Sequence, residues 1–169
     1  MDRIAIKARA DKKLCFTSLA HHITVPLLEN SLSQVKRSSR PGVDGQDVES
    51  AKASFASWSK PLIDAVHRKG YRPPPAKRVY IPKPGQTALR PIAMPTVKDK
   101  VLQRAVAEVL NTIYEEDFTN ASFGGRPKRS AHQAVATLRE GIRTRPINWV
   151  YEADLENFFG SLDHGWVER

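Results

Sequence analysis

No helix can pass through residues 70–75, because they read Gly-Tyr-Arg-Pro-Pro-Pro. The run ends in extended or polyproline geometry and divides the chain. Directly after it, residues 77–81 alternate like a strand, and residues 89–94 resemble its partner. The turn-forming residues 82–87 between them predict a β-hairpin. We therefore expect an α+β fold, with helices first, then a hairpin packed on helices, then a further strand.

Apolar residues recur at helical spacing on both sides of this hairpin. Thr24 and Pro26 are typical of a helix start. The Pro-Gly break at 41–42 ends the first helical region, and Asp47 or Ser50 can cap the helix that follows. The helical segments expected are 1–39, 47–68, 97–114 and 131–142.

A net charge of +9, from 27 Lys and Arg against 18 Asp and Glu, is typical of a nucleic-acid-binding protein. A solvated basic face explains the same charge equally well. The length of 169 residues suits one domain, or one domain and a fragment of another. A single cysteine, Cys15, excludes an internal disulfide and a Cys-based zinc cluster. No apolar run is long enough for a membrane span, so we expect a soluble, cytoplasmic protein.

A single carboxylate, Asp154, interrupts the apolar run 148–155, which is typical of a strand. Ionised groups are rarely buried unless they are paired or bound to metal, so this position needs an explanation, and a two-metal nucleotidyl-transfer site is the hypothesis we take up. Adjacent aspartates are absent from the chain, and the acidic residues 115–117 read as the solvated end of a helix. Asp163, followed by His164, reads as a helix N-cap.

Four blocks occur in a fixed order. They read Pro-Gly-Val-Asp-Gly at 41–45, Arg-Val-Tyr-Ile-Pro-Lys-Pro-Gly to Lys-Asp-Lys-Val-Leu-Gln within 78–103, Ser-Phe-Gly-Gly-Arg-Pro-Lys-Arg-Ser-Ala-His at 122–132, and the block around Asp154. Together they closely resemble the N-terminal part of a bacterial group II intron-encoded reverse transcriptase, or maturase. The resemblance implies a basic helical extension at 1–40, fingers at 41–147 and the first strand of a right-hand polymerase palm within 148–169.

The resemblance also implies roles for single residues. Lys83 and Arg90 would grip the incoming deoxynucleoside triphosphate (dNTP), a task that suits two cations because phosphoryl transfer depends on positioning and charge neutralisation. Asp154 matches the first catalytic aspartate, which would bind two Mg²⁺ ions together with the backbone carbonyl of Leu155. Phe159 matches the steric gate against a ribose 2′-hydroxyl. The alternatives are a solvated basic hairpin and, for Phe159, a core aromatic.

The resemblance places the Gly-rich loop at 122–130 beside the template, where a Gly-rich backbone and arginine forks approach nucleic acid closely. The basic N-terminal extension would contact intron RNA, or would be only a solvated helix face. The residues expected to bind template or intron RNA are Arg37, Arg40, Arg126, Lys128 and Arg129. The chain departs from the family at Gly125, where an aromatic is usual, at Lys128, where Gly is usual, and at Gly160, where Asp is usual.

The second catalytic motif of this family, Tyr/Phe-Ala-Asp-Asp, would lie beyond Arg169, so we expect the chain alone not to polymerise DNA, since Mg²⁺ requires several oxygen ligands. An unpaired apolar strand at 148–155 would favour self-association. The expected partners are RNA and dNTP, with no membrane. Two alternatives stay open: a non-catalytic RNA-binding module derived from a reverse transcriptase, and a fragment of a retron or CRISPR-associated reverse transcriptase.

Overall fold

The computed structural model describes residues 1–82, 85, 87 and 89–167. The chain divides into two units, Met1–Phe118 (unit 1) and Thr119–Arg169 (unit 2), and each is described by itself. Lys83 lies outside the described residues, so its expected role stays a prediction.

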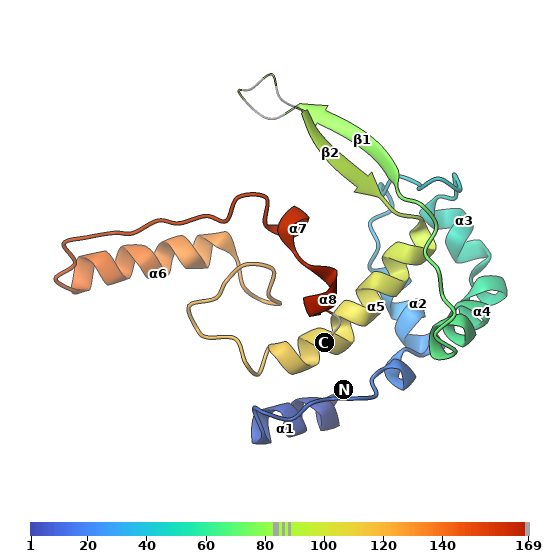
Figure 1. Cartoon of the computed structure of the whole chain (residues 1–169), viewed down its shortest axis with the longest axis horizontal. Helices are drawn as coiled ribbons and strands as arrows, with labels where there is room; N and C mark the ends of the chain where they lie inside the picture. Colours follow the sequence, from blue (N-terminus) through green and yellow to red (C-terminus); the bar gives the residue numbers. More distant parts are fainter. Residues whose placement is uncertain (83–84, 86, 88, 168–169) are drawn as a thin grey trace. The chain divides into compact units, whose positions relative to one another are not determined.

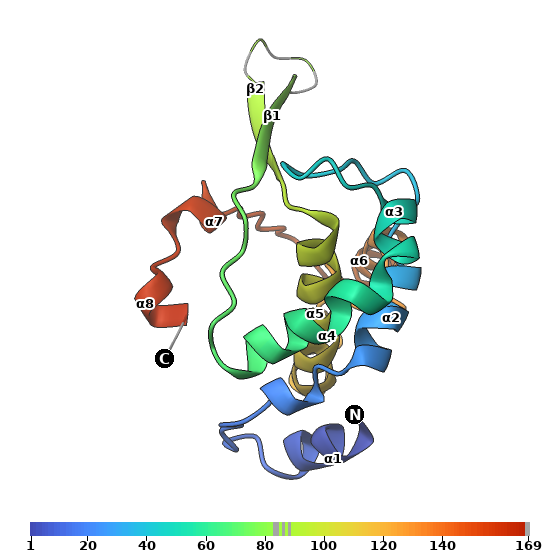
Figure 2. The ribbon, with the colours of Figure 1, turned by 90° about the vertical axis from the view of Figure 1, so that its right-hand side faces the viewer.

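Unit 1 combines helices with one two-stranded antiparallel sheet, in agreement with the expected mixture of helix and hairpin. Helix α5 is its central element, because α1, α2 and α3 all pack against it (Figures 1 and 2). The elements are α1 (Asp2–Ala10), the 3-10 turn η1 (Ala20–His22), α2 (Val25–Ser33), α3 (Val48–Ala53), α4 (Phe55–His67), β1 (Lys77–Pro82), β2 (Leu89–Met94) and α5 (Val97–Tyr114).

Side-chain caps start three of these helices, and two of the caps were predicted. The hydroxyl of Thr24 accepts from the backbone N–H of Leu27 at 3.4 Å, and the Asp47 carboxylate accepts from the N–H of Ser50 at 2.8 Å. Thr96 caps α5 in the same way. Each cap satisfies an N–H that has no partner within its helix. The predicted starts at Thr24 and Asp47 are therefore confirmed.

The helices are shorter than predicted in two places. In the segment expected to be helical from 1 to 39, the first helix ends at Ala10. The carboxylate of Asp11, the next residue, accepts from the N–H of Lys13 at 2.9 Å. The helix expected over 47–68 is interrupted at Ser54, whose hydroxyl donates to the carbonyl of Ser50 at 2.7 Å. Short polar side chains compete with the backbone for these bonds, so propensity over a long window overestimates continuity.

The core lies between α2, α4 and α5, with α3 closing one side. The predicted apolar side of 47–68 is confirmed, because its members are buried or half-buried in this core. The largest of its fully buried apolar side chains are Leu28, Val48, Val97 and Val101. Burial of these groups is the main term that stabilises unit 1.

One core position is polar without compensation. Ser31 on α2 is fully buried, and its Oγ has no hydrogen-bond partner among the described residues. An unmade hydrogen bond in the core costs free energy, and alanine removes the hydroxyl while leaving almost the same volume. We therefore expect Ser31→Ala to raise the free energy of unfolding by about 1 kcal/mol. Urea unfolding followed by circular dichroism measures this, with the exposed Ser57→Ala as control, and a loss of stability would contradict it.

The hairpin projects away from the helices of unit 1 instead of packing on them, so the expectation of a hairpin packed on helices is wrong (Figures 1 and 2). Its strands pair with Val79 opposite Ile92 and Ile81 opposite Arg90. Most hairpin side chains are exposed. Its register follows from the predicted alternation, but its pose depends on how its two ends are held.

Unit 2 begins with an irregular segment that contains the expected Gly-rich loop at 122–130, and continues with α6 (Ala131–Thr144), α7 (Phe158–Ser161) and α8 (His164–Val167). Ser130 and Gln133 form a reciprocal capping box at the start of α6. Asp163 caps α8, because its carboxylate accepts from the N–H of Trp166 at 3.1 Å, which confirms that prediction. The strand expected over 148–155 is absent, since no described segment pairs with these residues and a strand requires a partner.

None of the described helices is both long and apolar enough to cross a membrane.

Candidate functional site

One face of the hairpin combines apolar and cationic side chains. Residues two apart on a strand, and residues directly opposite on its partner, share a face of the sheet. This rule places Arg90, which is opposite Ile81, on the face of β1 that carries Lys77 and Val79. The same face and the 40–41 loop enclose a hollow of about 430 Å³. It is lined by Arg40, Pro41, Lys77, Val79, Ile81, Ile92 and Met94.

We call this surface, from Arg40 and Lys77 to Arg90, the hairpin face. Its centre is aliphatic. Cations lie at its base, at Arg40 and Lys77, and on β2, at Arg90. Two of the residues expected from the sequence to bind RNA or nucleotide, Arg40 and Arg90, therefore belong to one continuous surface. Arg37 is instead exposed and forms an ion pair with Glu49 at 3.3 Å.

Two cations that the sequence analysis missed hold the loop at the base of this face. Lys100 Nζ on α5 donates to Ser39 Oγ at 3.0 Å and to the carbonyl of Arg40 at 2.5 Å. One turn further along α5, Arg104 donates to the side-chain oxygen of Gln34. All three acceptors are neutral, so these bonds position the loop without cancelling its positive charge. The spacing of four residues indicates only that the two cations share a face of α5, whereas their partners are set by the fold.

The Gly-rich loop of unit 2 uses its arginines to hold its own shape. The half-buried Arg126 donates through Nη1 to the carbonyl of Thr119 at 2.7 Å and of Ser122 at 3.1 Å. The guanidinium of Arg129 lies 5.4 Å from the ring centroid of Phe123, within the range of a cation–π contact. Lys128 is exposed. The predicted RNA contacts of this loop stay predictions.

Backbone geometry explains the departure at Gly125 and shows that the departure at Lys128 is unfavourable. Gly125 has φ +68° and Lys128 has φ +60°, both in the left-handed region that favours glycine. An aromatic residue would be strained at 125, whereas lysine carries that strain at 128. We expect Lys128→Gly to stabilise unit 2 by about 1 kcal/mol. Thermal unfolding measures the change, with Lys128→Ala as the control that removes the charge but keeps the strain; equal stabilities for both variants would contradict the prediction.

Asp154 lies in an irregular, exposed segment, so the expectation of a buried carboxylate in a strand is wrong. The described residues contain no group of three or more Asp, Glu, His or Cys side chains placed to hold a metal ion. Asp154 with the carbonyl of Leu155 therefore does not fit a complete two-metal site. Phe159, on α7, is 85% exposed and meets the Phe158 ring edge-on at 5.3 Å between centroids.

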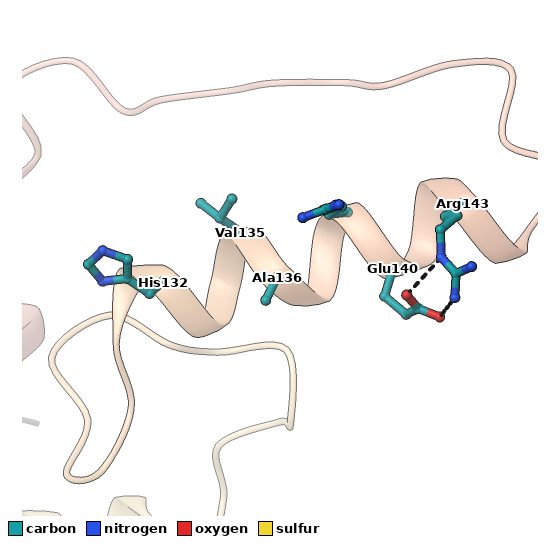
Figure 3. Close-up of a pocket in the computed structure, with 6 residues that line it drawn as sticks. His132, Val135, Ala136, Glu140 and Arg143 are labelled. Carbon is teal, nitrogen blue, oxygen red and sulfur yellow. Dashed lines mark hydrogen bonds and ion pairs between the residues drawn. The ribbon is translucent and has the colours of Figure 1, made fainter.

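A second hollow lies on helix α6, and all the residues that line it belong to that helix (Figure 3). Its polar side carries an ion pair between Arg143 and Glu140 at 2.8 Å. The apolar residues Val135, Leu138 and Ile142 recur at helical spacing and are exposed. This hollow is an open helix surface with no convergent chemistry.

Two ion pairs hold the basic N-terminal segment against the residues that follow α5, and we call these pairs, Arg9–Glu116 and Lys12–Asp117, the clasp. Arg9 forms two hydrogen bonds with the carboxylate of Glu116, at 2.8 and 2.9 Å, and Lys12 pairs with Asp117 at 2.9 Å. The acidic end at 115–117 is therefore paired with cations of the N-terminal segment, a contact that local sequence does not indicate, because Arg9 and Glu116 are 107 residues apart in the chain. Arg9 and Lys12 are engaged with carboxylates, which lowers their availability for RNA.

The clasp gives stability a defined pH dependence. The hydrogen bond from Arg9 lowers the pKa of Glu116 below its usual value of 4.5. A lowered folded-state pKa contributes stability above the unfolded pKa, and this contribution is lost as pH falls through the folded value. We expect the protection factors of the α1 amides, which correct exchange rates for the intrinsic effect of pH, to fall below about pH 4.5 in the wild type. In Glu116→Gln the same protection factors should be low already at pH 7, whereas Glu108→Gln, within α5, should behave like the wild type. Strong protection of α1 in Glu116→Gln would refute the clasp.

Comparison with known proteins adds independent information. Residues 81–168 match the family described as Reverse transcriptase (RNA-dependent DNA polymerase). Protein YkfC of Escherichia coli (strain K12) is 35% identical over 170 residues, covering 96% of this chain and 44% of that protein.

Two further relatives carry intron in their names. Group II intron-encoded protein LtrA of Lactococcus lactis subsp. cremoris is 37% identical over 105 residues, covering 62% of this chain and 17% of that protein. Putative COX1/OXI3 intron 1 protein of Saccharomyces cerevisiae is 25% identical over 145 residues, covering 85% of this chain and 17% of that protein. The chain thus spans less than half the length of each of these three relatives.

Proposed function

The chain belongs to the reverse transcriptase family, of the group II intron type, and on that premise we propose that it binds template RNA and the incoming dNTP through its fingers. Membership implies RNA as a partner, and the family generally uses divalent metal ions. The proposed layout is an extension at 1–40, fingers at 41–147 and the beginning of a palm at 148–169. The observation that carries the proposal is the hairpin face.

The chemistry of the hairpin face suits a nucleic-acid strand. Cations at its ends, Arg40 and Arg90, can neutralise phosphates, and release of counterions supplies the affinity. The aliphatic side chains between them, centred on Val79 and Ile92, offer an apolar floor to a base or a sugar. Phosphate contacts of this kind position a strand without reading its sequence. The face therefore suits a template of any sequence.

The nucleotide-binding part of the proposal rests on fewer described residues. Arg90, together with Lys83, would neutralise the triphosphate, and Phe159 would exclude a ribose 2′-hydroxyl. We propose Asp154 as one carboxylate ligand of the family's metal ions. Because the described residues do not complete a two-metal site, we also propose that the 169-residue chain alone does not copy RNA. Primer extension on an RNA template by the purified chain would overturn this part.

Salt-dependent RNA binding tests the template proposal. Fluorescence anisotropy of a labelled single-stranded RNA is measured across a salt series for the wild type, Arg40→Ala and Arg90→Ala. Each variant should bind more weakly. The slope of log affinity against log salt concentration should become less negative by about 0.7. Arg68→Ala is the matched control, because Arg68 is an exposed cation of the same unit on α4's end. Slopes for the two variants equal to that of the control would overturn the proposal.

One observation favours the alternative of a non-catalytic RNA-binding module. Asp154 is exposed without a cluster of acidic neighbours among the described residues, whereas the hairpin face is formed. A longer chain that binds RNA as above, but extends no primer with Mg²⁺ and dNTP, would support that alternative. No observation favours a retron or CRISPR-associated enzyme.

We also propose self-association through the segment 148–155, although it is not a strand here. Trp149 and Tyr151 expose more than nine-tenths of their surface, and exposed apolar patches favour association. Sedimentation velocity across a concentration series reports this directly. A monomer at all concentrations would exclude it.

A further inference from the structure

One buried carboxylate in unit 1 is not used by the proposed site. Asp99 is 2% exposed and lies in the first turn of α5. Its Oδ2 accepts from the hydroxyl of Thr96 at 3.1 Å, and its Oδ1 accepts from the hydroxyl of Tyr71. No lysine or arginine pairs with it among the described residues of its surroundings. Burial of a carboxylate without a cation needs another source of compensation.

The compensation comes from hydroxyls and from the helix itself. Helix α5 is 18 residues long, and its N-terminus carries partial positive charge that favours an anion in the first turn. The two hydroxyl donors supply charge-assisted hydrogen bonds. Burial and the bond to Asp99 raise the pKa of Tyr71 above its usual value, so the phenol stays a donor at neutral pH. The three side chains form one satisfied polar cluster beside the apolar core of unit 1.

The position of this cluster in the chain gives it a second consequence. Tyr71 directly precedes the segment 72–95, which carries the hairpin, and Thr96 directly follows that segment. One carboxylate therefore holds both ends of the hairpin-bearing segment at the same point. The hairpin itself projects from the helices, so its pose depends on these ends (Figure 2). The three prolines at 73–75 stiffen the connection between Tyr71 and β1.

A third segment closes on the same point. Gly42 packs so tightly on the segment after β2 that a Cβ built on it would lie 2.7 Å from Thr96 Cα and 2.9 Å from the Pro95 carbonyl carbon. The neighbouring Arg40 and Pro41 line the hairpin face. The cluster thus lies where the 40–42 loop meets the base of the hairpin.

We propose that Asp99, with Tyr71 and Thr96, is a positioning residue that sets the angle of the hairpin on the helical core. This sets the place of Arg90 relative to the rest of the fingers. The first part concerns the fold alone, and the second rests on the proposed function. We call the three side chains the hairpin latch.

Distances between spin labels test the latch without any ligand. Labels are placed at Tyr80→Cys, on the side of the hairpin opposite to the hairpin face, and at Lys60→Cys on α4. The background variant is Cys15→Ser. Both positions are exposed, and Cys15 is an exposed free thiol that would otherwise be labelled. Pulsed electron paramagnetic resonance gives the distance distribution. We expect a narrow distribution in the parent protein and a broader or displaced one in Tyr71→Phe and in Asp99→Asn, at temperatures where circular dichroism shows intact helices.

Controls separate positioning from general stability. Tyr114→Phe removes a phenol elsewhere in unit 1 and should leave the distribution unchanged. Ser31→Ala alters stability at a core position on α2, outside the latch, and should also leave it unchanged. Should Asp99→Asn fail to fold, Tyr71→Phe carries the test, because it retains the ring and loses only the hydroxyl. Distributions identical to the parent in every latch variant that folds would overturn the proposal.

The second readout is RNA binding by the same variants. A latch variant loses no cation, so we expect roughly tenfold weaker binding with an unchanged salt slope. The loss of affinity would reflect the free-energy cost of ordering the hairpin face when RNA binds. Affinity equal to the parent, alongside a displaced hairpin, would overturn the second part only. If the parent itself shows no salt-dependent binding, the proposed function fails, and the distance distributions still decide the latch.

Discussion

Replacing Trp58 by alanine is expected to lower the free energy of unfolding of unit 1 by about 3–5 kcal/mol. Trp58 on α4 is 6% exposed, and its indole N–H donates to the carbonyl of Ala51 at 2.9 Å. The ring of Phe55 packs edge-on against it, 5.0 Å between centroids. The variant loses apolar burial and this ring contact, and it leaves the Ala51 carbonyl unpaired in a cavity. Trp58 also joins α3 to α4 across the break at Ser54.

Urea unfolding measured by circular dichroism gives the free energy change for this variant. The matched control is Trp149→Ala, because Trp149 is 91% exposed in unit 2 and loses almost no burial. We expect the control to fall within about 0.5 kcal/mol of the wild type. Similar losses in the two variants would show that Trp58 does not organise the core as described.

Replacing Gly42 by alanine is the second large effect expected. The new Cβ would come within 2.7 Å of the backbone of Thr96, a distance that real Cβ atoms do not show. Backbone atoms cannot rotate away, so the loop or the start of α5 must move. We expect a loss of about 1–3 kcal/mol from overpacking. We also expect the hairpin to shift in the spin-label experiment, because Thr96 belongs to the hairpin latch.

Gly45 is the matched control for Gly42, since it lies in the same loop. Its φ is +68°, but no atom lies within 4 Å of a Cβ built on it. Gly45→Ala should therefore cost about 1 kcal/mol of backbone strain and leave the hairpin distances unchanged. Equal hairpin displacement by the two variants would contradict a steric role for Gly42.

Much of unit 1 was predictable from local patterns. The helix starts at Thr24 and Asp47, the hairpin at 77–94 and the long helix 97–114 all follow from caps, turn residues and apolar spacing, which act within a few residues. The strand at 148–155 was mispredicted from the same kind of signal. The apolar run is present, but a strand is formed by pairing, and pairing depends on residues far away in the chain.

The candidate site shows the same division. Arg40 and Arg90 were predicted as binding residues one at a time, and only the register of the hairpin and the course of the 40–41 loop place them on one face. The roles of Lys100 and Glu116 could not be read from their neighbours, because their partners are 60 and 107 residues away. The sequence shows which residues are charged, whereas the fold decides which residues pair with them.

The amino-acid sequence by itself determined the family to which this chain belongs, most of its helices and its hairpin. Caps, turn residues, periodicity and ordered motifs are read from residues that are close together in the chain. Only the tertiary structure decided that a buried carboxylate at position 99 holds both ends of the hairpin, and that the carboxylate at 154 is exposed. Burial and long-range pairing are set by the packing of distant segments, where the cost of desolvating a charge has to be met by particular partners.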